Sequence, residues 1–262
     1  MLTVSMPTYR TPPDLLDRAI TSLVEQTYQD VRLVVVNDGG PPLDLPTIWR
    51  THPQVTVYEL PENHGRYWCD ALVLDTVNDG WFAVHDADDW SDPDRFARLI
   101  EVAEPTGAAV ARYWRHQLDG RITLAEPALR EPDGRLHHLG HWCSGVYSVD
   151  RMVKAGGIHP EFRIGFDTLH TLMVQLTGDL AVDDTPGYHW QRRPDSLSTA
   201  RDTRQGSRFR YRTRLRLEKL YDTAWRASRR GEDPGRVIVD DIPDAVRSEI
   251  RRHGDKLFEV IR

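Results

Sequence analysis

The sequence predicts an α/β fold in which a mostly parallel sheet is flanked by helices. Short apolar runs alternate with segments of helical periodicity through the first hundred residues. Such a strand–helix–strand rhythm is typical of parallel strands joined by helical crossovers. A chain of 262 residues is long enough for one large domain with an appendage. We therefore expect a single α/β domain followed by a C-terminal helical extension.

The first half divides clearly into elements. Strands are predicted at residues 2–6, 31–36, 55–60 and 81–84. The run 31–36 is rich in β-branched valines, as in a strand buried on both faces. A helix at 14–26 places Leu16, Ile20 and Leu23 on one face, and a second helix is predicted at 67–77. Polar residues directly follow the strands at 2–6, 31–36 and 81–84. Because parallel strands end at the same edge of a sheet, we expect these polar residues to lie close together.

The second half has weaker periodicity. We predict strands at 108–115, 121–124 and 142–149, helices at 149–155 and 166–176, and loops at 126–141 and 194–206. The 194–206 connection is polar and expected to be mobile. A long basic helix then carries an apolar stripe that includes Thr213, Leu217 and Leu220, and a final amphipathic helix ends the chain.

Composition excludes several classes of protein. No apolar run approaches the roughly 18 residues that a membrane span requires, and the first ten residues lack the pattern of a secretory signal. Two cysteines, Cys69 and Cys143, are too few for a disulfide framework or a cysteine-only zinc site. They fit a reducing compartment, so we expect a cytoplasmic location.

Charge is distributed unevenly. Residues 201–230 hold 11 Lys and Arg against 3 Asp and Glu, although the whole chain has a net charge of -6. This distribution argues against a protein-wide nucleic-acid footprint. The basic stretch is suited to an anionic ligand, an acidic partner, the surface of a membrane or a second subunit of a homodimer.

The strongest chemical signal follows the strand at 81–84. Asp86, Asp88 and Asp89 lie within four residues of sequence. Packing like charges together is unfavourable unless a cation binds, and hard divalent ions such as Mg²⁺ and Mn²⁺ take oxygen ligands. The plainer alternative is that acidic residues here, Asp92 above all, cap the next helix. Capping does not account for Asp86 and Asp88 at the end of a strand.

An ordered set of motifs resembles the family-2 glycosyltransferases of the GT-A fold. The matching segments in the first half are Val4–Tyr9, Leu23–Tyr28, Leu33–Gly39, Asn63–Gly65 and Asp86–Asp94. In the second half, Gly156–Asp167 and Tyr188–Ser196 resemble the family's base-bearing segment and the mobile segment that closes over the diphosphate. The resemblance implies a GT-A catalytic domain at 1–200, with a nucleotide-sugar-binding half at 1–105 and an acceptor-binding half at 106–200. The extension is then 201–262.

The resemblance implies inverting transfer of a sugar from a nucleotide-diphosphate donor, such as a UDP-sugar, to a hydroxyl. The resemblance assigns Asp167 the role of the general base. It assigns Asp88 and His189 the role of ligands for Mn²⁺ or Mg²⁺. The donor-binding positions implied are Pro7, Thr8, Tyr9, Arg10, Asp38, Asn63, Gly65, Arg66, Asp86, Ala87, Asp88, Arg192, Arg193 and Ser196. Trp142 and Trp190 are candidates to stack on an acceptor, which is a saccharide, a lipid or a small molecule.

Two departures from the family pattern stand out. Asp70 lies where many members have Arg, and Arg66, one helical turn earlier, is the candidate replacement. Phe166 replaces the acidic residue that usually precedes the base. These departures leave open a non-catalytic module that binds sugar nucleotides or a partner. A phosphatase or phosphotransferase with an Asp-x-Asp motif is a further alternative, but Trp90 occupies the position where that class usually has Thr or Val.

Overall fold

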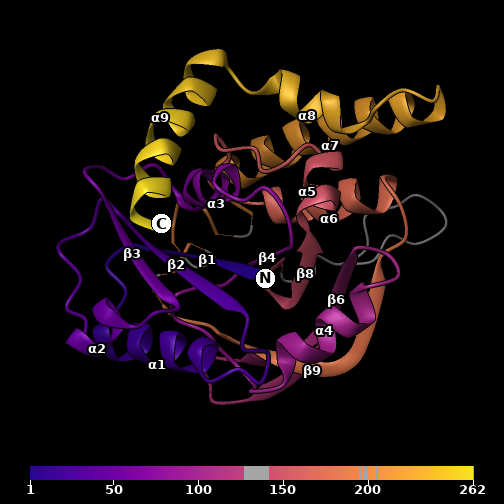
Figure 1. Ribbon diagram of the computed structural model, residues 1–262. Coiled ribbons are helices and arrows are strands. Elements are labelled where there is room, and N and C mark those ends of the chain that lie inside the picture. The colour runs from indigo at the N-terminus through magenta and orange to yellow at the C-terminus, as the bar shows by residue number, and fades with distance from the viewer. Residues whose placement is uncertain (127–141, 195, 198–199, 205, 262) are drawn as a thin grey trace.

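The computed structural model describes residues 1–126, 142–194, 196–197, 200–204 and 206–261. These residues form a nine-stranded sheet with helices on both faces (Figure 1). Along the sheet the order is β3-β2-β1-β4-β8-β6-β9-β5, and β7 pairs with β6 outside this path. The α/β fold expected from the sequence is confirmed.

Four parallel strands form the first half of the sheet. They are β1 (Leu2–Thr8), β2 (Val31–Asp38), β3 (Val55–Leu60) and β4 (Trp81–Val84). Leu2 of β1 pairs with Val31 on one side and Trp81 on the other. Because side chains alternate between the two faces of a strand, the apolar residues of β2 are buried in two hydrophobic cores, one on each face of the sheet. Val34 and Val36 lie in one core, and Leu33 and Val35 in the other.

The second half of the sheet is mixed. Its strands are β5 (Trp90–Ser91), β6 (Ala108–His116), β7 (Ile122–Ala125), β8 (Gly145–Ser148) and β9 (Ala181–Gln191). Strand β8 is antiparallel to β4 and β6, whereas β9 is parallel to β6 and antiparallel to β5. Strand β9 therefore brings the segment after residue 180 alongside the acidic segment that follows β4.

Helices cover the two faces of the sheet. On one face lie α1 (Pro13–Val24), α2 (Thr47–Thr51) and α4 (Arg95–Ala103) (Figure 1). The other face carries α3 (Arg66–Asp75), α5 (Val149–Lys154) and α6 (Phe166–Leu176). Pro13 begins α1, where a helix tolerates proline because its first N–H groups have no partner within the helix.

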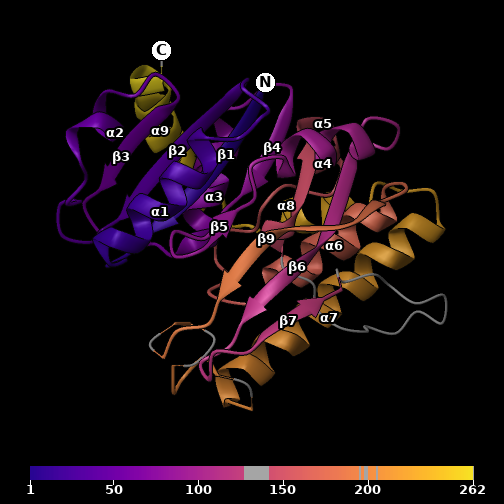
Figure 2. The ribbon, with the colours of Figure 1, turned by 90° about the horizontal axis from the view of Figure 1, so that it is seen from below.

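Three helices make up the C-terminal extension. These are α7 (Arg208–Arg229), α8 (Gly235–Asp241) and α9 (Asp244–Ile261). Helix α7 packs on α6, and α9 returns to pack on α3 and β3 (Figure 2). Leu257 and Ile250 of α9 are buried in the same core as the residues of α3. The extension thus shares a hydrophobic core with both halves of the sheet.

Some details differ from the expectations. The segment 142–149 is a short 3₁₀ turn (Trp142–Ser144) followed by β8, rather than one strand. Residues 188–191, expected within a mobile segment, belong to β9 and pair with β5 and β6. The predicted loop 126–141 lies, apart from residue 126, outside the described residues. In the part of the chain described, none of the helices has the length and apolar character needed to cross a membrane.

Candidate functional site

The carboxyl ends of β1, β2 and β4 lie side by side. These parallel strands are neighbours in the sheet, so Thr8, Asp38 and the segment after Val84 converge at one edge. This arrangement is the one expected from the polar sequence that follows each strand. Open α/β sheets bind ligands at this edge, which makes it the candidate site.

Asp38 organises the loop that precedes α3. Its carboxylate accepts hydrogen bonds from the Asn63 side chain (2.9 Å) and from the backbone N–H groups of His64 (2.7 Å) and Gly65 (2.9 Å). Asn63 also donates to the Asp38 carbonyl oxygen at 3.0 Å. Asp38, Asn63 and Gly65 therefore lie together, as members of one site should. Asp38 is only 3% exposed, and in this arrangement its carboxylate holds the loop.

The acidic segment after β4 is balanced by two arginines. Arg66 at the start of α3 pairs with Asp86, and Nε of Arg193 lies 2.5 Å from Asp88. Both carboxylates are partly accessible, with 22% and 17% of their side chains exposed. Burial and the neighbouring charge of Asp86 raise the pKa of Asp88, because both disfavour a second negative charge there. The chain thus gathers two carboxylates and brings in cations from distant segments to offset them.

Asp89 has a different environment from its neighbours. It is fully buried, and its carboxyl group accepts a hydrogen bond from the Tyr188 hydroxyl (2.5 Å) and one from the Gln191 backbone N–H (2.7 Å). Burial raises its pKa well above the ordinary value. Asp89 therefore holds the acidic segment, residues 86–89, against β9. This contact also fixes the position of Arg193, which is two residues beyond Gln191.

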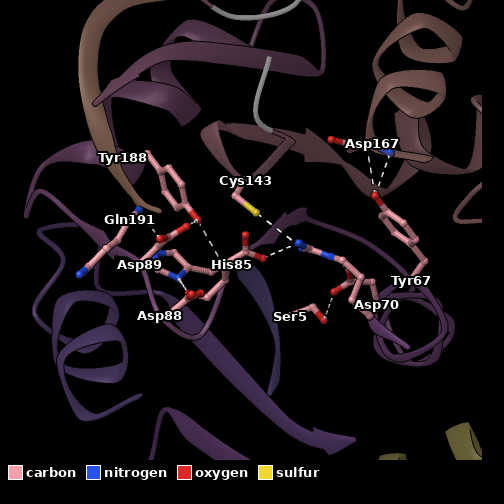
Figure 3. A network of polar contacts seen from close by, with 12 residues as sticks. Ser5, Tyr67, Asp70, His85, Asp88, Asp89, Cys143, Asp167, Tyr188 and Gln191 are labelled. Carbon is pink, nitrogen blue, oxygen red and sulfur yellow. Dashed lines mark hydrogen bonds and ion pairs between the residues drawn. The ribbon is translucent and has the colours of Figure 1, made fainter. Parts of the chain in front are cut away.

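Asp70 supports Arg66 from inside the protein. It is completely buried on α3 and accepts a hydrogen bond from the Ser5 hydroxyl of β1 at 2.7 Å. Its other oxygen lies 3.6 Å from Nε of Arg66, whose terminal nitrogens contact Asp86 and the Cys143 sulfur (Figure 3). Burial raises the pKa of Asp70 to about 7. The departure noted in the sequence is therefore a buried acid beneath Arg66, which itself lies beside Asp86 as the candidate replacement should.

Asp167 lies in the first turn of α6. Gly165, which precedes the helix, has a positive φ of 81° that only glycine adopts readily. The Asp167 carboxylate accepts a hydrogen bond from the Tyr67 hydroxyl at 3.1 Å. Burial raises the pKa of Tyr67 well above its ordinary value, so its hydroxyl stays protonated and remains a donor. Arg66 and Tyr67 are consecutive, so one turn of α3 contacts both Asp86 and Asp167 (Figure 3).

The remaining donor-binding candidates border the same edge. Thr8 is buried at the end of β1, and its hydroxyl has no hydrogen-bond partner among the described residues. Tyr9 is 46% exposed, beside an Arg10 whose backbone has a positive φ of 53°. Ala87 is buried, whereas Arg192 is exposed. Pro7 lies within β1, and Ser196 accepts a backbone hydrogen bond from Ala200.

His189 lies in β9 with both ring nitrogens engaged. Nε2 is 3.0 Å from the Asp92 carboxylate and Nδ1 is 3.0 Å from the ring of His116. The imidazole also stacks on Trp90, with ring centroids 4.7 Å apart. In this conformation neither nitrogen is open to a cation, so a ligand role for His189 stays a prediction. Asp92, expected to cap α4, instead contacts His189, and α4 begins without a side-chain cap.

The chemistry of the acidic segment fits a divalent cation. Asp86 and Asp88 offer carboxylate oxygens at the end of a strand, and the groups now facing them are cationic. Within the described ranges, one set of three residues lies within common reach of a single ion, namely Glu62, His64 and Glu249. That set does not include the acidic segment, so the candidate ligands there number two, and donor phosphates would have to complete the coordination.

The two tryptophans proposed for an acceptor have unequal exposure. Trp142 is 3% exposed and packs against Tyr67 and Phe166, with ring centroids 5.9 Å and 6.4 Å away. A ring buried in this way offers no free face to a sugar, which argues against stacking by Trp142. Trp190 is half-buried at the end of β9, with Arg115 over its ring.

Several residues of the site carry no local signal in the sequence. In the sequence, Tyr67 and Tyr188 look like core residues of a helix and a strand. In the structure, their hydroxyls donate hydrogen bonds to Asp167 and Asp89, respectively. Arg95 is fully buried beneath the acidic segment and donates to the Ser91 hydroxyl (2.8 Å) and the Cys143 carbonyl oxygen. Burial lowers the pKa of Arg95 to about 10. The pairing of β9 with β5 and β6 brings Tyr188 to Asp89, whereas the contact between Tyr67 and Asp167 joins α3 to α6.

The fold is similar to that of solved glycosyltransferase structures. The structure of S. aureus TarS 1–349 in complex with UDP-GlcNAc matches with a TM-score of 0.63 and 14% sequence identity. That match covers 100% of this chain and 81% of the TarS chain. The TarS structure in complex with UDP matches with a TM-score of 0.59 and 17% identity, over 74% of this chain and 61% of that one. At these identities the likeness establishes the GT-A fold.

Sequence comparison gives the family. The succinoglycan biosynthesis protein ExoO of Rhizobium meliloti (strain 1021) is 34% identical over 101 residues, which are 37% of this chain and 28% of ExoO. The match thus spans less than a third of that relative's length. The model of glycosyl transferase family 2 matches residues 3–154, which are more than half of the chain and include Asp38, Asp86 and Asp88. The chain is therefore a member of glycosyl transferase family 2.

Proposed function

We propose that this enzyme transfers a sugar from a nucleotide-diphosphate donor, a UDP-sugar, to an acceptor hydroxyl with inversion at the sugar carbon. Asp167 acts as the general base, and the edge formed by Asp38, Asp86 and Asp88 holds the donor. The TarS structures, which contain UDP and UDP-GlcNAc, support the choice of donor through their common fold with this chain.

One observation carries the proposal. Arg66 and Tyr67, adjacent on α3, contact Asp86 at the sheet edge and Asp167 on α6. These two acids come from opposite halves of the chain and have separate partners. Inverting transfer requires a donor-binding group on one side of the sugar and a base on the other. The first turn of α3 provides both positions from one rigid element.

The remaining groups suit departure of a diphosphate. Asp86 and Asp88 would hold a divalent cation, which supplies positive charge against the charge that develops on the leaving group. Arg66 and Arg193 already face these carboxylates, so they are placed to turn to the phosphates when a cation takes their place. Asp167 accepts the acceptor proton, while the Tyr67 hydroxyl fixes the direction of its carboxylate.

A panel of sugar nucleotides tests the activity directly. The enzyme is incubated with Mn²⁺ and each donor, and release of the nucleoside diphosphate is measured with water as the acceptor. We expect release from at least one UDP-sugar and loss of release when Asp167 is replaced by Asn. A protein that binds UDP but releases nothing from any donor would be the non-catalytic module instead.

Mn²⁺ together with UDP should stabilise the fold. A ligand present at about 100 times its Kd adds about 2.7 kcal/mol to the free energy of unfolding, and Tm rises by about 2–4 °C for each kcal/mol in a chain of this size. We therefore expect a rise of several degrees in a thermal-shift measurement. UDP alone should have a smaller effect, because Asp86 and Asp88 then oppose its phosphates.

Replacement of Asp88 by Asn should remove most of the Mn²⁺-dependent part of this shift. The matched control is Asp79→Asn, because Asp79 is exposed at the opposite end of β4 and should leave the shift unchanged. An unaltered response in the Asp88 variant would exclude this carboxylate as a ligand.

A further inference from the structure

An apolar cavity of about 440 Å³ lies between α6 and α7. Leu169 and Leu172 of α6 face Leu217 and Tyr221 of α7 across it. Figure 2 shows the two helices side by side. A space of this volume lies in the range of small-molecule sites, and most of its lining surface is apolar, although Arg210, Arg214 and Glu218 also border it. The cavity is therefore suited to a hydrocarbon chain rather than to a sugar.

The cavity lies next to the proposed base along the chain. Gly165 and Thr168, on either side of Asp167 in sequence, both line it. The Thr168 hydroxyl oxygen is buried and has no hydrogen-bond partner among the residues that the structure describes. A buried hydroxyl without a partner is costly, so a ligand with a polar group at this end would be favoured.

Two basic residues of α7, Arg210 and Arg214, border the cavity. Arg210 lines it and donates through Nε to the Thr203 carbonyl oxygen at 2.8 Å, while its terminal nitrogens have no partner within the described part of the chain. Arg214 also lines the cavity, and it pairs with Glu218, another lining residue, at 2.7 Å. The helix has eight Lys and Arg and two acidic residues. An anionic group beside the cavity would be electrostatically favoured.

The outward face of α7 is also partly apolar. Leu215 is 47% exposed and lies with Arg208 and Arg212 on the side of α7 away from the cavity, while Tyr211 is 64% exposed at the rim of the cavity. A basic helix with exposed aromatic and aliphatic side chains is typical of helices that lie at a membrane surface. The helix thus combines a cavity for a chain, a cation for a phosphate and a surface for the bilayer from which such a molecule would come.

We propose that the α6–α7 cavity binds a lipid phosphate that anchors the acceptor, with its hydrocarbon chain between Leu172 and Leu217 and its phosphate at Arg210. This inference rests on the proposed function, because it names the class of acceptor for the same enzyme. It places the anchor beside α6, whose first turn presents Asp167 to the part of the acceptor beyond the phosphate.

Binding of farnesyl phosphate tests the inference. Isothermal titration calorimetry of the full chain is carried out with farnesyl phosphate, farnesol and inorganic phosphate, each below any concentration at which it aggregates. We expect farnesyl phosphate to bind at least about tenfold more tightly than either of the others, because only it has both the chain and the anion. No detectable binding of farnesyl phosphate, or equal binding of farnesol, would overturn the proposal.

Two variants locate the site. Leu217→Trp should fill the cavity and weaken farnesyl phosphate binding at least about tenfold, while Leu215→Trp, on the outward face of the same helix, should not. Arg210→Gln should weaken farnesyl phosphate binding without changing that of farnesol, which keeps the test valid if Leu217→Trp fails to fold. Equal binding by wild-type protein and both cavity variants would place the ligand elsewhere.

Binding of UDP with Mn²⁺ is measured on the same samples. It should be unchanged in all three variants, since none of the three residues belongs to the donor edge. If farnesyl phosphate binds as expected but no donor is ever consumed, the cavity inference stands and the proposed enzymatic activity fails. If a donor is consumed and farnesyl phosphate does not bind, only the assignment of the acceptor fails.

Discussion

Replacing Asp167 by Asn is expected to lower kcat by about 10³-fold and to leave the Kd for UDP within about twofold of its wild-type value. The amide has the same shape as the carboxylate and still accepts a hydrogen bond from Tyr67, so the fold should be preserved. It cannot take up the proton of the acceptor. Steady-state kinetics with the best donor, together with calorimetry of UDP binding, measures both quantities.

Two further variants define the role of this carboxylate. Tyr67→Phe should lower kcat by about tenfold, because Asp167 keeps its charge but loses the hydroxyl that orients it. Asp150→Asn, an exposed acidic residue in the first turn of α5, should have no effect on kcat. Wild-type kcat in the Asp167 variant would remove this residue from the position of the base.

Replacing Asp70 by Asn is expected to change how the stability of the protein depends on pH. Burial raises the pKa of Asp70 from 3.8 to about 7, so between these values the folded protein binds a proton that the unfolded chain releases. The free energy of unfolding of the wild type therefore falls as pH rises from about 4 to about 7. The total decrease in the free energy of unfolding that Asp70 causes over this interval is about 4 kcal/mol.

The comparison with the variant isolates this group. Arg66 and Ser5 contact Asp70, and Asp86 lies beyond Arg66, but all three are retained in Asp70→Asn. Urea unfolding at pH 5 and pH 8 should show that the variant loses less stability than the wild type across this interval. Asp79→Asn, exposed before β4, should follow the wild type. Parallel wild-type and Asp70→Asn curves would show that Asp70 keeps an ordinary pKa.

The candidate donor edge could be located from the sequence because its signals are local. An apolar run predicts a buried strand, and the polar residues that end β1, β2 and β4 follow such runs directly. Since neighbouring parallel strands end at the same edge, Asp38 and Asp86 had to come close once the strands were recognised. The family match over residues 3–154 covers this same part.

The other side of the site depends on contacts between distant segments. Strand β9 contains Asp183, Asp184, Pro186 and Gly187, which are poor strand formers, so its sequence gives little sign of a strand. The hydrogen-bonded pairing with β5 and β6 stabilises the extended conformation that the local sequence does not favour. The Tyr188 hydroxyl gains its partner Asp89 in this way, whereas the Tyr67 hydroxyl meets Asp167 through a contact between α3 and α6. Burial of Trp142 was equally unpredictable, because it follows from packing on Tyr67 and α6.

Helix α9, near the end of the chain, packs against α3 and β3 of the first half. Ile250 and Leu257 pack into the core beside α3, and Tyr58 of β3 contacts His253 of α9 at 3.4 Å. Through α7, the same extension is packed on α6. Contacts therefore link the extension both to α3 and β3 and to α6, so a relative motion of the two halves of the sheet would have to disturb some of these contacts. We therefore expect the C-terminal extension, as well as the sheet, to hold the spacing between Asp86 and Asp167.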